Sequence, residues 1–152
     1  MKKVTRSAYK VTDFDSDRNM LKQLLLVALG GALGSALRYL TAILLARHYT
    51  GSIPLATLVV NVLGCFLIGL LIGLCSDTAY FRLLFITGFC GGFTTFSTFT
   101  AESYTMLREG AYGLAILYIV GSVLIGLLAL WVGVCLSRTS LLDGLCSEAK
   151  SS

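Results

Sequence analysis

Two stretches of the chain, residues 54–76 and 111–136, carry no charged side chain. Each is long enough to cross the hydrocarbon core of a bilayer as a helix, which takes about 20 residues. Hydrophobic residues make up 56% of the 152 positions and charged residues 13%, against roughly 25% charged in soluble domains. A soluble chain of this length does not enclose enough volume to bury such a composition. The sequence therefore predicts an integral membrane protein.

Two further apolar runs, residues 23–46 and 83–101, are interrupted by polar features but are also long enough to span. Pro54 opens the second of the four runs and suits a first helical turn, where its missing N–H costs nothing. We expect one all-α membrane domain of four transmembrane helices, with no room for a second globular domain. The predicted organisation is a polar N-terminal tail at 1–22, the membrane domain at 23–137 and a short polar tail at 138–152.

The distribution of basic residues predicts how the chain lies in the membrane. An even number of spans places both termini on one side, and nine Lys and Arg residues fall on that side against two on the other. This bias predicts cytoplasmic termini in a multi-pass protein of the plasma, or inner, membrane. The net charge of +4 comes largely from the N-terminal tail, so it indicates orientation rather than nucleic-acid binding.

The residue types that enzymes need are not arranged for catalysis. The five cysteines form no CxxC pair, and the single histidine, His48, leaves no set of zinc ligands. The pattern contains no nucleophile–base pair either, so we expect no enzyme activity. The cysteines are better interpreted as small packing residues within apolar runs.

The third apolar run contains the most unusual segment, in which two glycines are followed by a dense set of hydroxyls between Gly91 and Thr98. Paired glycines at bilayer depth allow a helix to unwind, and such breaks are tolerated only beside a cavity or a bound ion. Freed carbonyls would suit a small hard cation, whereas the N-terminus of the resumed helix would favour an anion. The alternative is a close glycine contact with hydroxyls bonded back to the helix.

Phenylalanines recur at three-residue spacing through this segment, at Phe93, Phe96 and Phe99, and on a helix they would share one face. Aromatic rings carry a positive edge, so rings presented edge-on can line an anion path. The alternative interpretation is ordinary packing against lipid or core.

Isolated polar side chains in the other spans are further candidates. Asn61 lies in the middle of the second span, where its amide either donates to an anion or forms an interhelical hydrogen bond. Arg38, inside the first span, either stabilises an anion or extends to the interface. Tyr118 and Ser122 lie four residues apart on one face of the fourth helix, which is either a pore wall or a small-residue contact. The spacing Gly30-xxx-Gly34 indicates close helix packing, in a bundle or an oligomer.

Three segments together resemble the Fluc/CrcB family of fluoride channels. They are GGALGSALRY from Gly30, TLVVNVLG from Thr57 and GFCGGFTTFSTF from Gly88, and the similarity covers about residues 23–137. The resemblance implies antiparallel dimers with two pores that passively conduct fluoride out of the cytoplasm. It also implies a third helix broken in mid-membrane around a structural Na⁺ ion at the dimer centre, held by the backbone carbonyls of Gly91 and Thr94 from both subunits.

The resemblance further implies which side chains line the fluoride pathway. The residues at matching positions are the amide Asn61, the rings Phe96 and Phe99, the hydroxyl residues Ser97, Thr98, Tyr118 and Ser122, and the vestibule arginine Arg38. Gly126 and Leu130 stand where some members carry hydroxyls, so the later part of the polar track on the fourth helix differs here.

Three alternatives remain beside a fluoride-conducting homodimer. The charge bias favours one orientation, and the first alternative is therefore pairing with an oppositely oriented homologue. A proton-coupled exporter of cationic drugs would need a membrane-buried carboxylate. The first, second and fourth runs contain none, and Glu102 is expected at the end of the third. A purely structural subunit would explain the glycines but not the segment that follows them.

Overall fold

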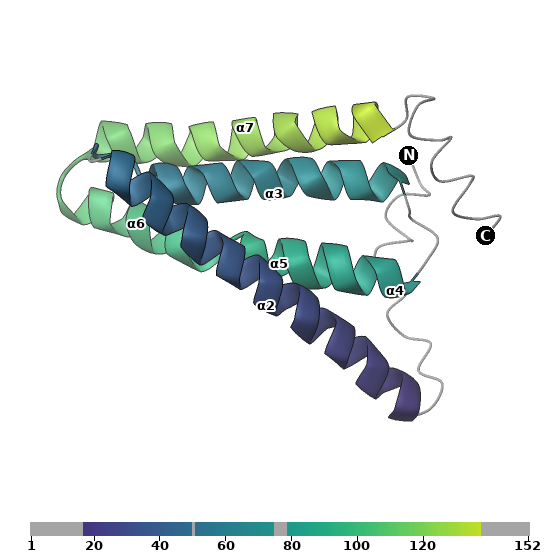
Figure 1. Ribbon diagram of the computed structural model, residues 1–152. Coiled ribbons are helices and arrows are strands. Elements are labelled where there is room, and N and C mark those ends of the chain that lie inside the picture. The colour runs from purple at the N-terminus through teal and green to yellow at the C-terminus, as the bar shows by residue number, and fades with distance from the viewer. Residues whose placement is uncertain (1–16, 50, 75–78, 138–152) are drawn as a thin grey trace.

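The computed structural model describes residues 17–49, 51–74 and 79–137 (Figure 1). Four helical segments in these ranges are long and apolar enough to cross a membrane, as predicted. The elements are α2 (Asp17–His48), α3 (Leu55–Leu74), α4 (Ala79–Phe81), the π-helix η1 (Arg82–Cys90), α5 (Gly91–Phe93), α6 (Phe96–Arg108) and α7 (Tyr112–Ser137). The segments α4 to α6 together make the third span. The beginning of α2 and the end of α7 lie at the same end of the bundle (Figure 1).

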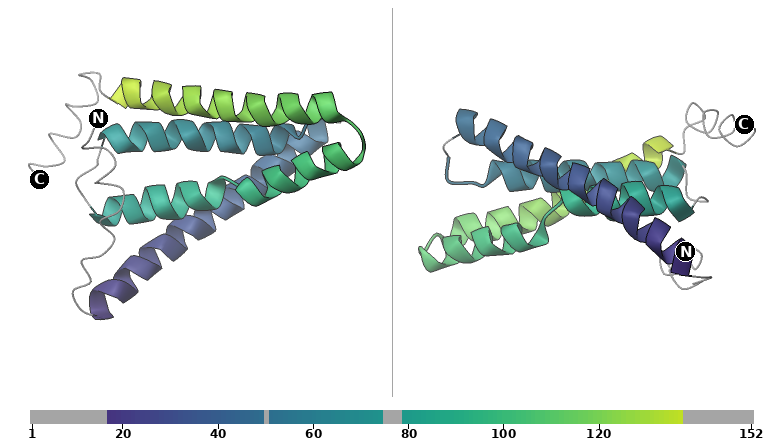
Figure 2. Two further views of the ribbon diagram at one scale, coloured as in Figure 1. Left: turned by 180° about the vertical axis from the view of Figure 1, so that it is seen from behind. Right: turned by 60° about the horizontal axis from the view of Figure 1, so that its bottom comes forward.

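Helix α2 is longer than the sequence predicts, since it begins at Asp17 rather than at Gln23. Its 32 residues extend about 48 Å at 1.5 Å per residue, whereas the hydrocarbon core is about 30 Å thick. A longer helix fits the bilayer by tilting. Figures 1 and 2 show α2 crossing the other helices at a steep angle.

Helices α3 and α7 are the second and fourth spans of the bundle. They lie side by side and run in the same direction (Figure 1). The helices approach closely because glycines face each other across the contact. A Cβ on Gly133 would overlap the carbonyl oxygen of Phe66, and one on Gly69 would overlap that of Leu130. This pair is therefore fixed by backbone-to-backbone packing, which membrane helices use in place of a hydrophobic driving force.

The glycines of α2 make a second close contact, with η1 and α5. A Cβ on Gly34 would overlap the carbonyl oxygen of Phe89, and one on Gly30 would overlap that of Leu84. The Gly30-xxx-Gly34 motif, which the sequence could assign to a bundle or to an oligomer, thus forms a contact within one chain. It holds the first half of the third span against α2.

The third span is broken, but not where its glycines suggest. Gly91 keeps helical angles (φ −63°, ψ −35°), and only Thr94 (φ −79°, ψ 161°) and Thr95 (φ −148°, ψ 113°) are extended. The expectation that the helix unwinds at the paired glycines is therefore wrong. Gly92 instead permits a close approach, because a Cβ there would lie 2.5 Å from the Gly31 carbonyl oxygen on α2. Thr94 and Thr95 therefore fit the interpretation of a helix break, and Gly92 fits that of a close glycine contact.

Candidate functional site

A cavity of about 260 Å³ lies beside the break in the third span. Its walls come from α2, from α3 and from the residues around the start of α6. The lining residues are Ser35, Arg38, Tyr39, Ala42, Ala56, Thr57, Val60, Thr95 and Thr98. A pocket with a guanidinium and several hydroxyls in an otherwise apolar wall matches the general pattern of a ligand site, in which a few polar groups fix orientation.

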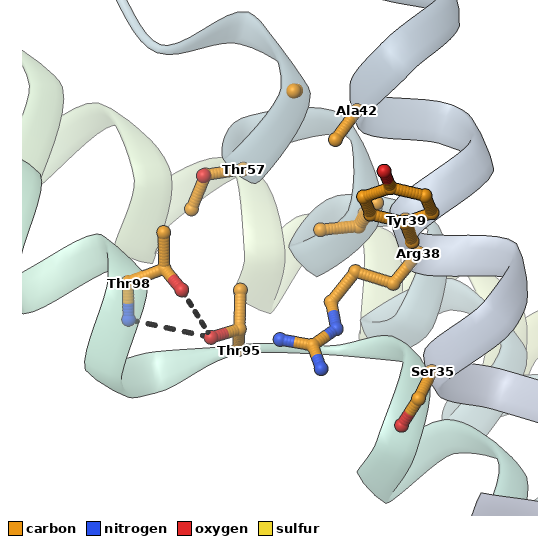
Figure 3. Close-up of a pocket in the computed structure, with 9 residues that line it drawn as sticks. Ser35, Arg38, Tyr39, Ala42, Thr57, Thr95 and Thr98 are labelled. Atoms are coloured by element: carbon orange, nitrogen blue, oxygen red, sulfur yellow. Dashed lines mark hydrogen bonds between the residues drawn. The ribbon is translucent and has the colours of Figure 1, made fainter. Parts of the chain in front are cut away.

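Arg38 points into this cavity rather than away from the bundle. Figure 3 shows its guanidinium extending toward Thr95, between α2 and the start of α6. Its Nε atom is buried and has no hydrogen-bond partner among the described residues. Of the two interpretations of Arg38, the geometry favours a charge presented to the cavity over one extended to the membrane interface.

Asn61 of α3 holds the break by two hydrogen bonds to one residue. Its Oδ1 accepts the backbone N–H of Thr95 at 2.8 Å, and its Nδ2 donates to the Thr95 carbonyl at 3.1 Å. The amide thus pairs with both backbone groups of Thr95, as a neighbouring peptide unit would. The interhelical bond that the sequence left open as an alternative is present. One hydrogen of the amide NH₂ remains beyond these two bonds.

Thr95 also forms the cap of the resumed helix α6. Its Oγ1 accepts the Thr98 N–H at 3.3 Å, the usual arrangement of an N-cap hydroxyl, and donates to the Thr98 Oγ1 at 2.9 Å (Figure 3). Because Thr98 Oγ1 accepts this bond, its own hydroxyl hydrogen remains available at the cavity wall. Ser97, the next residue back, is exposed on the surface of the protomer.

The two predicted pore phenylalanines follow the break. The Phe96 and Phe99 ring centroids lie 6.1 Å apart, and Phe99 in turn lies 5.3 Å from the Tyr118 ring. Phe96 is 79% exposed, whereas Phe93 is buried and stacks on Phe89 before the break. The expectation that Phe93 shares a face with the other two is therefore wrong, because the extended residues rotate α6 away from α5.

Glu102 is a polar residue of the site that the sequence reasoning misplaced. It lies inside α6, which continues to Arg108, and not at the end of the span. Its carboxylate accepts a hydrogen bond from Thr57 Oγ1 at 2.7 Å and another from the Tyr118 hydroxyl at 2.9 Å. The hydroxyl hydrogen of Tyr118 is therefore committed to Glu102 in this conformation.

Ser122 lies one turn beyond Tyr118 on α7. Its Oγ is buried and has no partner among the residues that the structure describes. An unpaired buried hydroxyl costs free energy, so native proteins keep one where something else binds it. One turn further on, Gly126 lies against the Cys65 Sγ, and a Cβ there would be 3.4 Å away.

The sequence reasoning did not assign Thr57, Thr95 or Glu102 to the site, although two of them carried a signal. Thr57 precedes Asn61 by four residues and therefore shares its face of α3. Glu102 follows Thr98 by four residues, so a helix continued beyond Ala101 would have placed both on one face. Thr95 gave no separate signal, because a threonine among many hydroxyls does not identify itself as a cap.

Four membrane-spanning helices, with a break in the third beside a cavity of hydroxyls and one guanidinium, define a small multi-pass membrane protein with a polar site inside the bilayer. The chain belongs to the CrcB family: the family model described as "CrcB-like protein, Camphor Resistance (CrcB)" matches residues 25–134.

Relatives that bear the name "Fluoride-specific ion channel FluC" agree with this membership. The one from Azobacteroides pseudotrichonymphae genomovar. CFP2 is 42% identical over 78% of this chain and 98% of its own length. The relative from Methylobacillus flagellatus is 47% identical over 73% of this chain and 91% of its own length. The one from Phocaeicola vulgatus is 46% identical over 78% of this chain and 100% of its own length. Residues 25–134, which the family model matches, include parts of all four spans.

Proposed function

We propose that this chain forms a fluoride-specific ion channel of the plasma membrane, through which fluoride leaves the cytoplasm down its gradient. The proposal rests on family membership together with one structural observation. Phe96 and Phe99 lie side by side immediately after a helix break, next to hydroxyl residues, at the depth where a lipid-facing helix would carry neither a break nor free polar groups. The protein is a channel and not an enzyme.

The pathway starts at the cavity beside Arg38, whose charge attracts anions into it. From there fluoride passes the hydroxyls of Thr98 and Ser97 and the ring edges of Phe96 and Phe99. The edge of an aromatic ring is positive, so it holds an anion without a fixed charge. Asn61, Tyr118 and Ser122 line the pathway on the α3 and α7 side. Several modest donors in sequence replace the hydration shell and still release the ion, in a passage too narrow for chloride.

The working unit of the proposal is an antiparallel dimer. Its support is the outer surface of α6, where Phe96, Ser97 and Thr100 are exposed, together with Gly91 before the break. Exposed hydroxyls and extended backbone are costly in lipid, and a second chain against this surface removes that cost. The oppositely oriented partner is a second copy of this chain or a homologue. Reporter fusions at Ser152 that reveal only cytoplasmic C-termini would exclude the second copy.

A Na⁺ ion at the centre of the dimer completes the proposal. The carbonyl oxygens of Gly91 and Thr94 suit it, because hard cations prefer oxygen ligands and both residues lie within one turn of the break. Gly91 is exposed on the surface of the protomer, so carbonyls of two chains can approach one ion there. The charge of the Na⁺ ion would offset that of fluoride nearby. The ion would also keep the broken helices of the two chains in register.

Fluoride efflux from proteoliposomes tests the proposed function. Purified protein in vesicles loaded with potassium fluoride releases fluoride, measured with a fluoride electrode, once valinomycin balances the charge. Vesicles loaded with potassium chloride are the control, and they retain their chloride. The Phe96→Ile variant removes the ring edge and abolishes fluoride efflux, while cross-linking still detects the dimer. Unchanged efflux from that variant would refute the role given to Phe96.

A further inference from the structure

The hydrogen bonds around the break explain why two particular carbonyls are available to a cation. In an uninterrupted helix each carbonyl accepts the N–H of the residue four positions later. The carbonyl of Gly91 would accept the N–H of Thr95, and that of Thr94 would accept the N–H of Thr98. Neither bond forms, because the helix ends at Phe93 and resumes at Phe96.

Both of these N–H groups are held by side chains instead. The N–H of Thr95 donates to Asn61 Oδ1 at 2.8 Å, and the N–H of Thr98 donates to Thr95 Oγ1 at 3.3 Å. Each side-chain oxygen therefore withdraws the donor that one carbonyl would otherwise accept. The carbonyls that lose these two donors are those of Gly91 and Thr94, the residues proposed to hold Na⁺.

The carbonyls of Cys90 and Gly92, on either side of Gly91, do have hydrogen-bond donors within the protein. The Cys90 carbonyl accepts both the N–H of Thr94 at 2.9 Å and its hydroxyl at 3.0 Å. The Gly92 carbonyl lies 3.5 Å from the Ser35 hydroxyl on α2. A buried carbonyl without a partner is costly, so proteins provide one. The carbonyls immediately before and after Gly91 thus have protein partners, whereas those of Gly91 and Thr94 have lost their helical donors to side chains.

We infer that Asn61 and Thr95 are positioning residues for the cation site, because their side chains take the two N–H donors and so leave the Gly91 and Thr94 carbonyls free to bind Na⁺. The inference rests on the proposed function only through the cation site. It gives Asn61 a second role beside the fluoride pathway, since one hydrogen of its amide remains free for an anion. Thr95, which sequence reasoning did not single out, is therefore required for Na⁺ binding in addition to the carbonyls that hold the ion.

Two substitutions each remove one of the side-chain oxygens that accept these N–H groups, with little change in the shape of the side chain. Thr95→Val deletes the cap oxygen, and Thr95→Ser keeps it as the matched control. Asn61→Leu deletes the acceptor of the Thr95 N–H. In both Thr95→Val and Asn61→Leu the released N–H turns back toward its helical carbonyl and competes with the cation. Outer-shell changes of this kind typically weaken metal binding roughly 10–100-fold.

The measurement is the Na⁺ concentration that gives half of the maximal rise in unfolding temperature of the purified protein in detergent. N-methyl-D-glucamine chloride keeps the ionic strength constant. Because Na⁺ stabilises only the state that binds it, this concentration reports the affinity for Na⁺. The measurement does not depend on fluoride flux. We expect an increase of roughly tenfold or more for Thr95→Val and Asn61→Leu and no change for Thr95→Ser.

The outcomes separate the inference from the proposed function. If the wild-type protein is stabilised by Na⁺ and both variants need the same Na⁺ concentration as it does, the positioning role is refuted. If Na⁺ does not stabilise the wild-type protein, the cation site fails and the inference with it, whereas the fluoride efflux assay is unaffected. If one variant does not fold, the other still decides, since each removes a different donor-accepting oxygen.

Discussion

Replacing Glu102 with leucine should destabilise the protein far more than an ordinary surface substitution. The Glu102 carboxylate accepts hydrogen bonds from Thr57 and Tyr118, which are only 5% and 4% exposed. Glu102→Leu leaves two buried hydroxyls without an acceptor, and each such group costs about 1–3 kcal/mol. The free energy of unfolding should therefore fall by about 2–6 kcal/mol. Glu102→Gln keeps one acceptor oxygen and should lose about half as much.

The assay is an SDS titration of the protein in mixed micelles, followed by circular dichroism, which gives the free energy of unfolding for each variant. Glu109→Leu is the matched control, because Glu109 is exposed at the end of the same helix. It should change stability by less than about 0.5 kcal/mol. A double-mutant cycle of Glu102→Gln with Tyr118→Phe measures their coupling. A Glu102→Leu variant as stable as the control, or zero coupling to Tyr118, would refute the reasoning.

Three other substitutions test separate parts of the structure. Gly34→Ala inserts a methyl group into the contact between α2 and η1 and should cost about 1–3 kcal/mol, whereas Gly113→Ala, with open space around it, should be neutral in the same titration. Thr98→Val should slow fluoride efflux from proteoliposomes more than Tyr118→Phe does, because the Tyr118 hydrogen is already committed to Glu102; the reverse order would contradict this assignment of donors. Ser122→Ala removes an unpaired buried hydroxyl, so it should slow efflux without lowering the free energy of unfolding; a loss of stability would assign Ser122 a packing role.

The existence and order of the four spans could be predicted because hydropathy reports directly on the cost of placing a residue in lipid. The ends of the spans could not. Asp17 begins α2 and Arg108 ends α6, both beyond the predicted limits. A tilted helix continues past the apolar stretch that crosses the membrane, and a helix in contact with neighbours tolerates polar residues on its protected face. Glu102 is such a residue, and placing it required the packing of α6 against α3 and α7.

The site was predictable in its residue types but not in its hydrogen bonds. Composition located the break near Gly91 and Gly92, because those residues weaken a helix. The break itself falls at Thr94 and Thr95, where Asn61 of another helix holds the backbone of Thr95 by two bonds. A sequence pattern along one helix does not contain a partner contributed by a second helix. For the same reason the exporter alternative depended on where Glu102 lay, and family membership, rather than that position, decides against it.

The hydrogen bonds also divide the polar groups of the site into those that hold the fold and those that can serve an ion. Thr57, Glu102 and Tyr118 satisfy one another, and Thr95 is occupied by Asn61 and Thr98. The donors that remain include one amide hydrogen of Asn61, the Thr98 hydroxyl hydrogen, Ser122 Oγ and the Arg38 guanidinium. These come from four different helices, so no single helix binds the anion strongly. Under the proposed function, a site divided in this way would strip water from fluoride while keeping each contact weak enough to release it, which is the requirement for conduction rather than storage.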